Sequence, residues 1–268
     1  MSRSQSCDGA AREAVREVYD GPEGELFSLV MGEQVHLGGL EASRALAEAA
    51  GIRGGRGVDL CCCNGAGMRF LVRFQEVVSM IGIDLAQSVV DLGRDRCLLD
   101  GSASQIEFRC GDACASDLAD ESADFVWSED AWCYVPNKDR LIAEAARIVR
   151  EGGVIAFSDW VEGPAGMSSG ERDFLCASMK FDNLETMDGY RNLLETEGCE
   201  VVLVEDTGLY APQMALFAEM LAKQLRWDAL RLLDFDEGKV DAVIQGFRVL
   251  SDWGVDGKIA QARFVARR

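Results

Sequence analysis

The stretch Gly57-Val-Asp-Leu-Cys-Cys-Cys-Asn-Gly-Ala-Gly67 decides the fold of this chain. It begins as a short apolar run, typical of a buried parallel strand, and continues through small residues into a helix predicted to begin near Gly65. Such a turn lets the polar groups of a ligand approach the backbone, and the helix N-terminus adds a partial positive charge. The stretch therefore predicts an α/β fold with a ligand site at the end of its first strand.

Acidic residues follow the ends of further predicted strands. Asp84 ends the next apolar run and lies 19 positions after Gly65, the spacing at which nucleotide-binding α/β folds place an acid on ribose hydroxyls. Asp112 and Glu129 follow the next two predicted strands in the same way. Their carboxylates supply acceptors for a ribose diol and for an adenine amino group, so the pattern predicts a nucleoside site.

Strands and helices alternate with short connections, which is the pattern of a doubly wound, mostly parallel sheet. The predicted strands are the run from Val58, then 77–83, 105–109, 123–128, 154–159, 199–205 and 259–268. The predicted helices are 10–19, 41–50, the helix from Gly65, 86–100, 138–150, 187–197, 214–233 and 240–253. The last strand arrives through a long helical insertion, so we expect it to join the sheet antiparallel at its edge.

Composition excludes several classes of protein. The chain has 268 residues, 48% of them hydrophobic, and no apolar run long enough to span a membrane. The N-terminus has no apolar segment typical of secretion, so we expect a cytoplasmic protein. A net charge of −19 argues against nucleic acid as a partner. His36 is the only histidine and the ten cysteines form no Cys-x-x-Cys pair, so we expect reduced thiols and no metal site.

The first motif resembles that of class I S-adenosylmethionine-dependent methyltransferases, which runs acid, apolar residue, Gly-x-Gly-x-Gly. Asp59-Leu60 match its beginning and Gly65 its last glycine, whereas Cys61 and Cys63 replace the first two glycines. Their side chains narrow the approach to the methionine part of the cofactor. The resemblance implies S-adenosylmethionine as the cofactor. The residues expected to hold it are Asp59, Cys61, Cys63, Gly65, Asp84, Leu85, Asp112, Ala113 and Glu129.

From Tyr19 onward the chain is also similar to the sarcosine/dimethylglycine N-methyltransferases that make glycine betaine. The similar segments are Asp124-Phe-Val-Trp-Ser-Glu-Asp-Ala131, Pro136-Asn-Lys138, Glu144-Ala-Ala-Arg-Ile-Val149, Gly152-Gly153, Lys180, Gly189-Tyr-Arg191 and Gly257-Lys258. The family's N-terminal Trp-Gly-Gly…Ile-His-x-Gly-x-Tyr pattern is kept at Gly32, Val35, His36 and Gly38 and changed at Val30 and Leu40. The resemblance implies methyl transfer to the amine nitrogen of a small amino acid such as sarcosine or dimethylglycine.

Four residues are expected near the methyl acceptor. His36 corresponds to a substrate-proximal histidine of that family, although a lone histidine is often structural. Trp132, Tyr134 and Trp160 follow the fourth and fifth predicted strands, where the acceptor would stand, although any aromatic residue can also belong to the core. We expect His36, Trp132 and Tyr134 to serve catalysis and Trp160 to contact the substrate.

Lys180 and Arg191 are either solvated helix charges or a clamp for a substrate carboxylate. The ten cysteines also motivate a second hypothesis, methylation of a thiolate or of arsenite. A third hypothesis is a non-catalytic module that binds S-adenosylmethionine, because Cys61 and Cys63 alter the first motif. In each case the expected partner is a small molecule, with no nucleic-acid or membrane partner, and the chain acts as a monomer or homodimer.

We expect one domain over the whole chain. Residues 1–52 would form a helical lid, residues 53–160 the cofactor-binding core, and residues 161–268 the acceptor-side helices together with the last two strands. The predicted fold is thus a Rossmann-like, doubly wound α/β sheet of seven strands with a helical insertion before the last strand.

Overall fold

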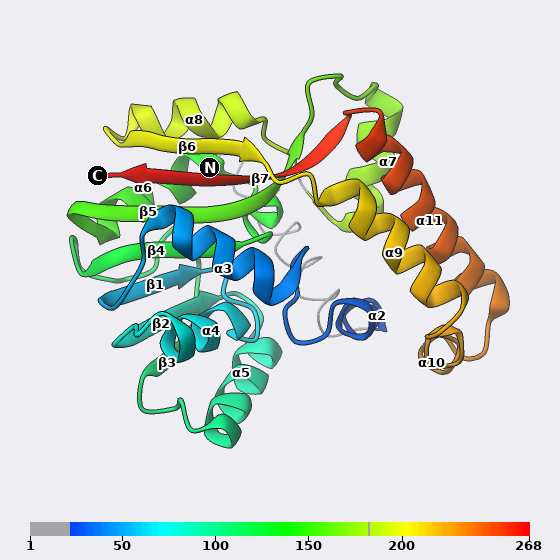
Figure 1. The fold of residues 1–268 in the computed structure, drawn as a ribbon, viewed down its shortest axis with the longest axis horizontal. Coiled ribbons are helices and arrows are strands. Elements are labelled where there is room, and N and C mark those ends of the chain that lie inside the picture. The colour runs from blue at the N-terminus through cyan, green and yellow to red at the C-terminus, as the bar shows by residue number, and fades with distance from the viewer. Residues whose placement is uncertain (1–21, 182) are drawn as a thin grey trace, which may run out of the picture.

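Seven strands in the order β3-β2-β1-β4-β5-β7-β6 form the central sheet (Figure 1). The computed structural model describes residues 22–181 and 183–268. The strands are β1 (Arg56–Leu60), β2 (Ser79–Asp84), β3 (Ile106–Cys110), β4 (Ala123–Glu129), β5 (Val149–Glu162), β6 (Glu200–Asp206) and β7 (Ile259–Arg267). β1 to β5 are mutually parallel, and β7 runs antiparallel to both β5 and β6.

Helices connect the strands, and some of them extend beyond the carboxyl ends of the parallel strands. Their bounds are α2 (Pro22–Met31), α3 (Gly39–Ala50), α4 (Ala66–Phe74), α5 (Gln87–Asp100), η1 (Trp132–Tyr134), α6 (Lys138–Ile148), α7 (Ser169–Met179), α8 (Met187–Thr196), α9 (Tyr210–Ala222), α10 (Arg226–Leu232) and α11 (Glu237–Val255). Among the described helices, none is long and apolar enough to cross a membrane.

Both faces of the sheet are covered, because successive side chains of a buried strand point to opposite sides. On β4, Val126 packs into the core beneath α6 and α8, whereas its neighbour Trp127 packs into the core beneath α3, α4 and α5. Leu141 of α6 and Leu46 of α3 are completely or almost completely buried in these two layers. The sheet is therefore a rigid layer whose carboxyl edge is available for a site.

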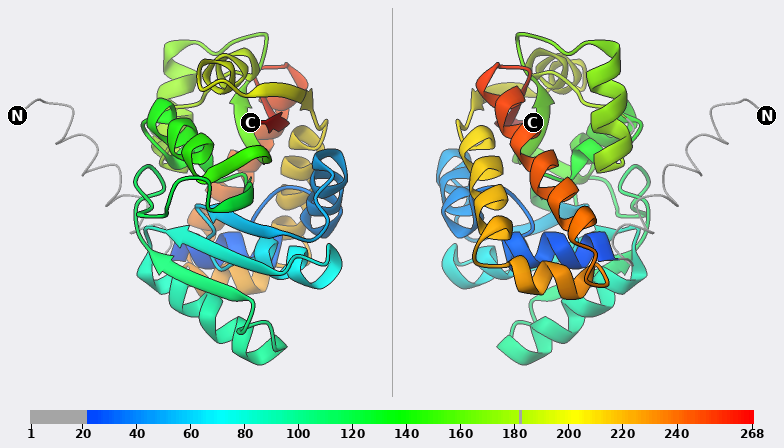
Figure 2. Two further views of the ribbon diagram at one scale, coloured as in Figure 1. Left: turned by 90° about the vertical axis from the view of Figure 1, so that its left-hand side faces the viewer. Right: turned by 90° about the vertical axis from the view of Figure 1, so that its right-hand side faces the viewer.

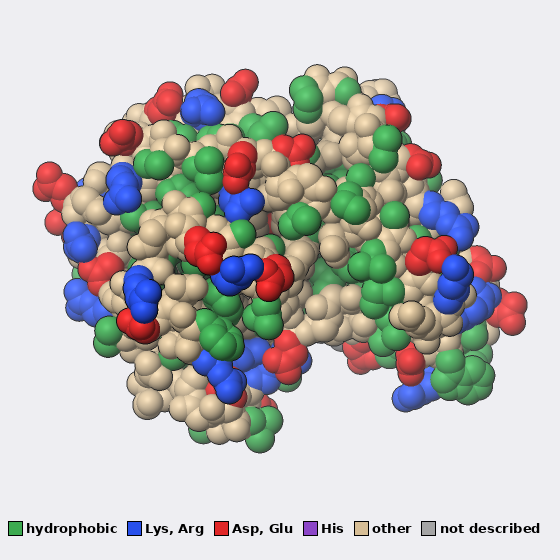
Figure 3. All heavy atoms as spheres, in the orientation of Figure 1, with side chains coloured by type: hydrophobic (Ala, Val, Ile, Leu, Met, Phe, Trp, Pro, Cys, Tyr) green, Lys and Arg blue, Asp and Glu red, His purple; other side chains and the backbone are tan. Residues whose placement is uncertain are grey.

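A helical lobe stands beyond the carboxyl ends of the parallel strands (Figure 1). It consists of α2, α7, α9, α10 and α11, which share one hydrophobic core that includes Leu26, Leu175, Phe217 and Phe247. Figure 2 shows α9 and α10 beside α11 on the outer side of this lobe. In Figure 3, hydrophobic side chains gather over α9, and charged side chains lie over much of the sheet side of the molecule.

The predicted fold class is confirmed, with a difference in the position of the last strand. β7 is antiparallel as expected, but it lies between β5 and β6, and β6 forms the edge. The burial of the two strands explains this order, because β7 is buried along nearly its whole length whereas β6 alternates between exposed and half-buried residues.

Some helices also differ from the prediction. The single helix predicted over 214–233 is two helices, because α9 ends at Ala222 and α10 begins at Arg226. α2 and α7 were not predicted from the sequence. The helix predicted over 10–19 lies outside the described residues.

Candidate functional site

A cavity lies at the carboxyl ends of β1, β2 and β4, and we call it the strand-end cavity. Its lining includes six carboxylates, and four of them, Asp59, Asp84, Asp112 and Glu129, lie within two residues of the end of a strand. Parallel strands bring these residues together although they are far apart in the sequence, as expected for a crevice at the carboxyl edge of an α/β sheet. The cavity is therefore rich in hydrogen-bond acceptors.

The turn after β1 has the backbone shape that the glycine motif requires. Cys61, Cys63 and Gly65 have φ angles of +70°, +48° and +73°, all in the left-handed region. The N–H groups of Cys61 and Cys62 both donate to the carbonyl of Ile83 on β2, at 2.8 and 3.0 Å. A side chain with a Cβ pays about 1 to 2 kcal/mol for this conformation. The two cysteines therefore occupy strained positions that glycine would adopt freely.

Asp84 fastens this turn to the end of β2. Its Oδ2 accepts from the backbone N–H of Cys63 at 2.8 Å, and its Oδ1 accepts from the N–H of Ala86 at 3.0 Å. Burial raises the pKa of the Asp84 carboxyl, although these N–H donors act in the opposite direction. Each carboxylate oxygen can accept more than one hydrogen bond, so Asp84 can still receive hydroxyl donors from a ligand.

Asp59 carries a buried acceptor that lacks a donor. Its side chain lines the cavity, and its Oδ1 has no hydrogen-bond partner within the described part of the chain. Burial raises the pKa of this carboxyl well above its ordinary value, with further contributions from Glu129 and Asp84. A cationic amino group entering the cavity would supply the missing donor and balance the acids. The amino group of S-adenosylmethionine has this chemistry, so these residues fit the cofactor that the sequence implies.

The thiols of the turn are expected to be unreactive. Burial, followed by the nearby Asp84, raises the pKa of Cys61 and Cys62 well above the ordinary value and that of Cys63 to about 12. The reactive form of cysteine is the thiolate, which such an environment disfavours at neutral pH. These cysteines therefore shape the turn and do not act as nucleophiles.

His36 and Ser43 form a hydrogen-bond cluster with Glu129 at the wall of the cavity. Ser43 Oγ donates to Glu129 Oε1 at 2.6 Å, and it lies 3.1 Å from His36 Nε2. The same imidazole nitrogen lies 3.2 Å from Oε1 of Gln34 and 3.4 Å from Glu129 Oε1, and Nδ1 lies 3.3 Å from the carbonyl of Leu37. Both ring nitrogens thus face oxygen atoms of the protein, so a role as a proton acceptor would require one of these contacts to break.

A second, much smaller cavity adjoins the strand-end cavity, and we call it the aromatic pocket. Val35, His36, Asp130 and Tyr134 line both cavities. The other residues that line the aromatic pocket are Phe27, Met31, Leu37, Trp160, Met179 and Phe181. No lysine or arginine among the described residues lines this pocket.

The rings of the aromatic pocket support one another through edge-to-face contacts. Phe181 meets Tyr134 with ring centroids 4.9 Å apart and Trp160 with centroids 5.5 Å apart. Trp160 in turn meets Tyr210 of α9 at 5.0 Å. Such pairs fix ring orientation as well as burying area. The pocket therefore has rigid walls drawn from β5, η1 and the segment after α7.

Asp130 is the carboxylate shared by the two cavities, and its oxygens are already engaged. Oδ2 accepts from the N–H of Leu37 at 2.8 Å, and Oδ1 accepts from Ser158 Oγ at 2.8 Å. Nε2 of Gln261 lies 2.8 and 2.7 Å from the two oxygens. These bonds tie the segment after α2 to β5 and β7, which makes Asp130 a structural anchor.

The structure brings together most of the residues predicted to hold the cofactor. Those that line the strand-end cavity are Asp59, Cys61, Cys63, Asp84, Leu85, Asp112, Ala113 and Glu129. Gly65 is not among the lining residues. Its Cα is packed against the ring of Phe108, so that a Cβ at this position would lie 2.4 Å from a ring carbon. Gly65 therefore shapes the turn from behind the cavity.

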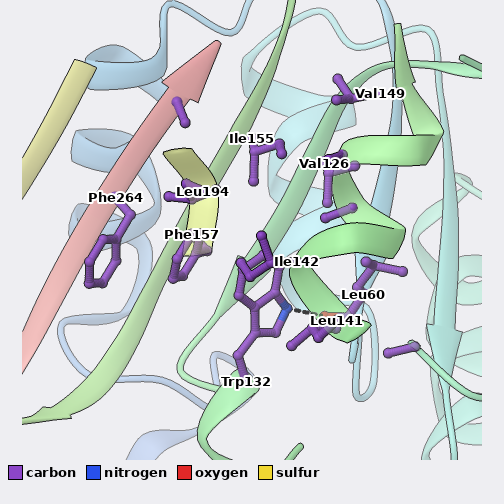
Figure 4. Close-up of a cluster of buried hydrophobic side chains, with 14 of the residues drawn as sticks. Leu60, Val126, Trp132, Leu141, Ile142, Val149, Ile155, Phe157, Leu194 and Phe264 are labelled. Atoms are coloured by element: carbon purple, nitrogen blue, oxygen red, sulfur yellow. Dashed lines mark hydrogen bonds between the residues drawn. The ribbon is translucent and has the colours of Figure 1, made fainter. Parts of the chain in front are cut away.

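Trp132 requires a correction, because its side chain lies in the core and not in either cavity. It is completely buried, its Nε1 donates to the carbonyl of Leu60 at 3.2 Å, and its ring lies 4.0 Å from that of Phe157 (Figure 4). The tight turn of η1 directs Trp132 inward and leaves Tyr134 at both cavities. Core packing, the alternative considered for every strand-end aromatic residue, holds for Trp132.

Lys180 and Arg191 also lie away from the two cavities. Lys180 follows α7 and lines a different groove, with Phe174 and Val243. Arg191 lies on α8, where its nearest ionic partner is Asp188 at 3.9 Å. The carboxylate clamp expected from these residues is therefore absent from the aromatic pocket. Trp160, by contrast, does line that pocket, as do His36 and Tyr134.

Several lining residues were missed from the sequence. Phe27 and Met31 are four positions apart on α2 and so share one helix face, but this segment was not predicted to be a helix. Phe181 directly follows Lys180, the residue that the family resemblance indicated. Ser43, which lines neither cavity but donates to Glu129 at the wall, lies within a predicted helix, and nothing in its spacing distinguishes it. An i, i+4 pair of large apolar residues was the signal that could have revealed the α2 wall.

Two sequence comparisons identify known proteins that are similar to this chain. Residues 58–157 match the model of the family described as a methyltransferase domain. The 27-O-demethylrifamycin SV methyltransferase of Amycolatopsis mediterranei is 25% identical over 85% of this chain and 88% of its own length.

Solved structures share the fold. A Galdieria sulphuraria protein described as a sarcosine dimethylglycine methyltransferase superposes with a TM-score of 0.74 at 22% identity, covering 85% of this chain and 86% of its own. Phosphoethanolamine N-methyltransferase 2 of Haemonchus contortus, in complex with phosphomonomethylethanolamine and S-adenosylhomocysteine, gives a TM-score of 0.80 at 18% identity, covering 94% of this chain and 58% of its own. At these identities the likeness establishes the Rossmann-like fold, and the acceptors named for these relatives differ.

Proposed function

We propose that this chain, an S-adenosylmethionine-dependent methyltransferase with the class I fold, transfers the methyl group to the nitrogen of a small amine. The observation that carries the proposal is the aromatic pocket beside the acid-lined strand-end cavity, joined to it at His36 and Tyr134. The sulfonium of S-adenosylmethionine supplies an electrophilic methyl group when it is bound. The protein then needs to align the acceptor with that methyl group and to exclude water.

We assign the strand-end cavity to the cofactor. In this assignment Asp84 accepts from the ribose hydroxyls, Asp112 and the neighbouring Ala113 face the adenine, and Asp59 receives the amino group of the methionine part. The assignment is supported by the buried, unpartnered Oδ1 of Asp59 and by the left-handed turn that brings backbone N–H groups to the cavity wall. The acids together give the cavity a negative field that suits a cationic cofactor.

We assign the aromatic pocket to the acceptor. A methylated amine becomes a more persistent cation, and aromatic faces such as those of Tyr134, Trp160 and Phe181 attract cations that have lost their water. The same apolar surroundings disfavour a protonated amine before the reaction, so they favour the neutral nitrogen that can attack. One pocket thus suits both the nucleophile and its product.

Proton removal is the step for which the pocket offers least help. Asp130 already accepts several hydrogen bonds, and both nitrogens of His36 face protein oxygens. We therefore infer that the amine loses its proton to solvent before the methyl transfer, and that His36 holds the pocket wall against Ser43 and Glu129. As a consequence, kcat/KM for the amine should rise with pH up to the ordinary pKa of that amine.

Sarcosine and dimethylglycine, the acceptors implied by the sequence resemblance, are the first compounds to examine. Each carries a carboxylate, for which the described lining of the aromatic pocket provides no lysine or arginine. We therefore place amines without a carboxylate ahead of these amino acids. Methylation of a thiol or of arsenite is less favoured, because none of the described cysteines lines the aromatic pocket.

The test is a product-detected assay with methyl-labelled S-adenosylmethionine over matched acceptors that share a carbon skeleton and differ only in the nucleophile. The matched set contains a secondary amine and the corresponding alcohol and thiol, and sarcosine, dimethylglycine and arsenite are assayed beside it. The proposal predicts labelled product from the amine at a rate well above that from the alcohol or thiol. Labelled product from the thiol, the alcohol or arsenite without product from any amine would contradict it.

A further inference from the structure

Two residues, Phe27 of α2 and Met179 of α7, line both the aromatic pocket and a separate groove between α2, α7 and α11, which we call the helical groove. The pocket and the groove therefore adjoin at these two residues. Figure 2 shows α11 running across the helical lobe, and the ring contact of Phe174 with Trp253, at 5.9 Å, joins it to α7.

The walls of the helical groove are apolar over most of their surface. Leu26, Val243, Phe247 and Leu250 contribute hydrophobic side chains, and the polar lining residues are Ser178 and Lys180. Phe174 at its edge is 50% exposed, which is unusual for so large an apolar side chain. The groove therefore favours an apolar occupant.

Small residues keep the groove open along α11. Gly246 lines it, and a Cβ built at this position would meet no atom within 4 Å. Ala242, one turn earlier on the same helix face, also lines the groove and is exposed. Glycine within a helix lowers stability relative to other residues. Its presence at position 246 is explained if the helical groove must stay open there.

We propose that the helical groove binds an apolar tail carried by the methyl acceptor, whose amine head lies in the aromatic pocket. This inference rests on the proposed function and narrows the substrate class to an amine with a hydrocarbon chain. The tail would pass between Phe27 and Met179, whose side chains have the rotational freedom to part. Because these two residues line both the groove and the pocket, the arrangement favours a tail of the acceptor over an unrelated partner at the same surface.

The test uses the full chain and a series of N-methylalkylamines with unbranched chains from methyl to decyl. In the wild-type protein, kcat/KM should rise with chain length by about fourfold for each methylene that becomes buried. Gly246→Trp places an indole at a groove position where an added Cβ meets no atom within 4 Å, and it should abolish most of the advantage of long chains over short ones. Ala242→Trp should act in the same direction. Gln245→Trp, next to Gly246 on the exposed side of α11, should keep the wild-type dependence on length.

A dependence on chain length that is absent in the wild type, or that survives both Gly246→Trp and Ala242→Trp, would overturn the inference. Equilibrium titration of the same amines into the protein saturated with S-adenosylhomocysteine separates this inference from the proposed function. If no amine of any length is methylated but long chains still bind more tightly and Gly246→Trp removes that gain, the proposed function fails and the groove stands. If short amines are methylated and binding does not depend on length, the groove assignment fails and the proposed function stands.

Discussion

The strand-end cavity and the aromatic pocket touch each other, yet they are built in different ways. The strand-end cavity takes its residues from the ends of neighbouring parallel strands, and its polar groups are carboxylates such as Asp59 and Asp84. The aromatic pocket takes its residues from α2, η1, the end of β5 and the segment after α7, and its walls are rings such as Trp160 and Phe181. The first is set by the sheet and the second by the packing of the helical lobe.

This difference explains how such a fold can keep one cofactor and change its acceptor. The sheet fixes the positions of the acids, since each parallel strand must end at the same edge. The helical lobe has a hydrophobic core distinct from the two that cover the faces of the sheet, and it contains residues such as Phe217 and Phe247. Cofactor binding and acceptor choice are therefore predicted to respond to different substitutions.

The largest effect is expected from Trp132→Ala, which should act on the fold and not on the acceptor. Trp132 is completely buried against Phe157 and Leu60, so its truncation should lower the free energy of unfolding by about 3 to 5 kcal/mol. Urea unfolding followed by circular dichroism measures this change. Trp227→Ala, at a ring that is 64% exposed, serves as the control and should cost about 0.5 kcal/mol or less. Unchanged stability with a reduced rate of methyl transfer would return Trp132 to the acceptor site.

Asp84→Ala should weaken ligand binding in the strand-end cavity and leave binding in the aromatic pocket unchanged. If Asp84 accepts from the ribose hydroxyls as proposed, its loss leaves them unpaired and should cost about 1 to 3 kcal/mol of affinity for S-adenosylhomocysteine, whereas loss of its bonds to the N–H groups of Cys63 and Ala86 lowers stability. Isothermal titration measures the affinity. Asp91→Ala, at an exposed carboxylate on α5, should bind as the wild type does. Equal affinity in a folded Asp84→Ala protein would remove Asp84 from the cofactor site.

Cys63→Gly should have a smaller effect and should preserve or improve cofactor binding. Relief of the left-handed backbone at φ +48° gains about 1 kcal/mol, whereas the added freedom of glycine in the unfolded chain costs a similar amount. Cys61→Gly should likewise preserve or improve cofactor binding. Cys62→Gly is the informative contrast, because Cys62 is buried against Met68 and Gly82, and its loss should lower the thermal midpoint. Abolished methyl transfer with intact cofactor affinity in Cys63→Gly would revive a chemical role for the thiol.

Arg191→Ala should have the smallest effect of the series. Its guanidinium lies on α8, outside both cavities, with Asp188 as its nearest ionic partner. We expect the KM for the acceptor and the KM for S-adenosylmethionine to match those of the wild type in steady-state assays. A rise confined to an acceptor that carries a carboxylate would restore the clamp predicted from the sequence.

Much of the sheet and of the strand-end cavity could be predicted from the sequence, for a physical reason. A buried parallel strand must be a short apolar run, and the chain must turn with small residues where a ligand approaches. The stretch around Asp59 has both features, so it predicts both the strand and the ligand site. The acids at Asp84 and Glu129 follow from the same rule, because each comes directly at the end of such a run.

The aromatic pocket could not be predicted to the same extent, because its residues meet only through tertiary packing. Tyr134 and Trp132 are two positions apart in the same strand-end turn, and only the turn of η1 decides that one faces the cavities and the other the core. The wall formed by Phe27 depends on where α2 lies against α9 and α10, which no local pattern specifies. The family resemblance indicated Lys180, whereas its apolar neighbour Phe181 is the residue in the pocket.

The most direct test of the division between the two cavities is the pair of Michaelis constants measured in two variants, Asp84→Asn and Phe181→Leu, with the best amine found. The division predicts that Asp84→Asn raises the KM for S-adenosylmethionine by about tenfold and leaves that for the amine unchanged. Phe181→Leu should raise the KM for the amine and leave that for S-adenosylmethionine unchanged. A Phe181→Leu protein with an unaltered KM for the amine, or one variant that raises both constants equally, would contradict it.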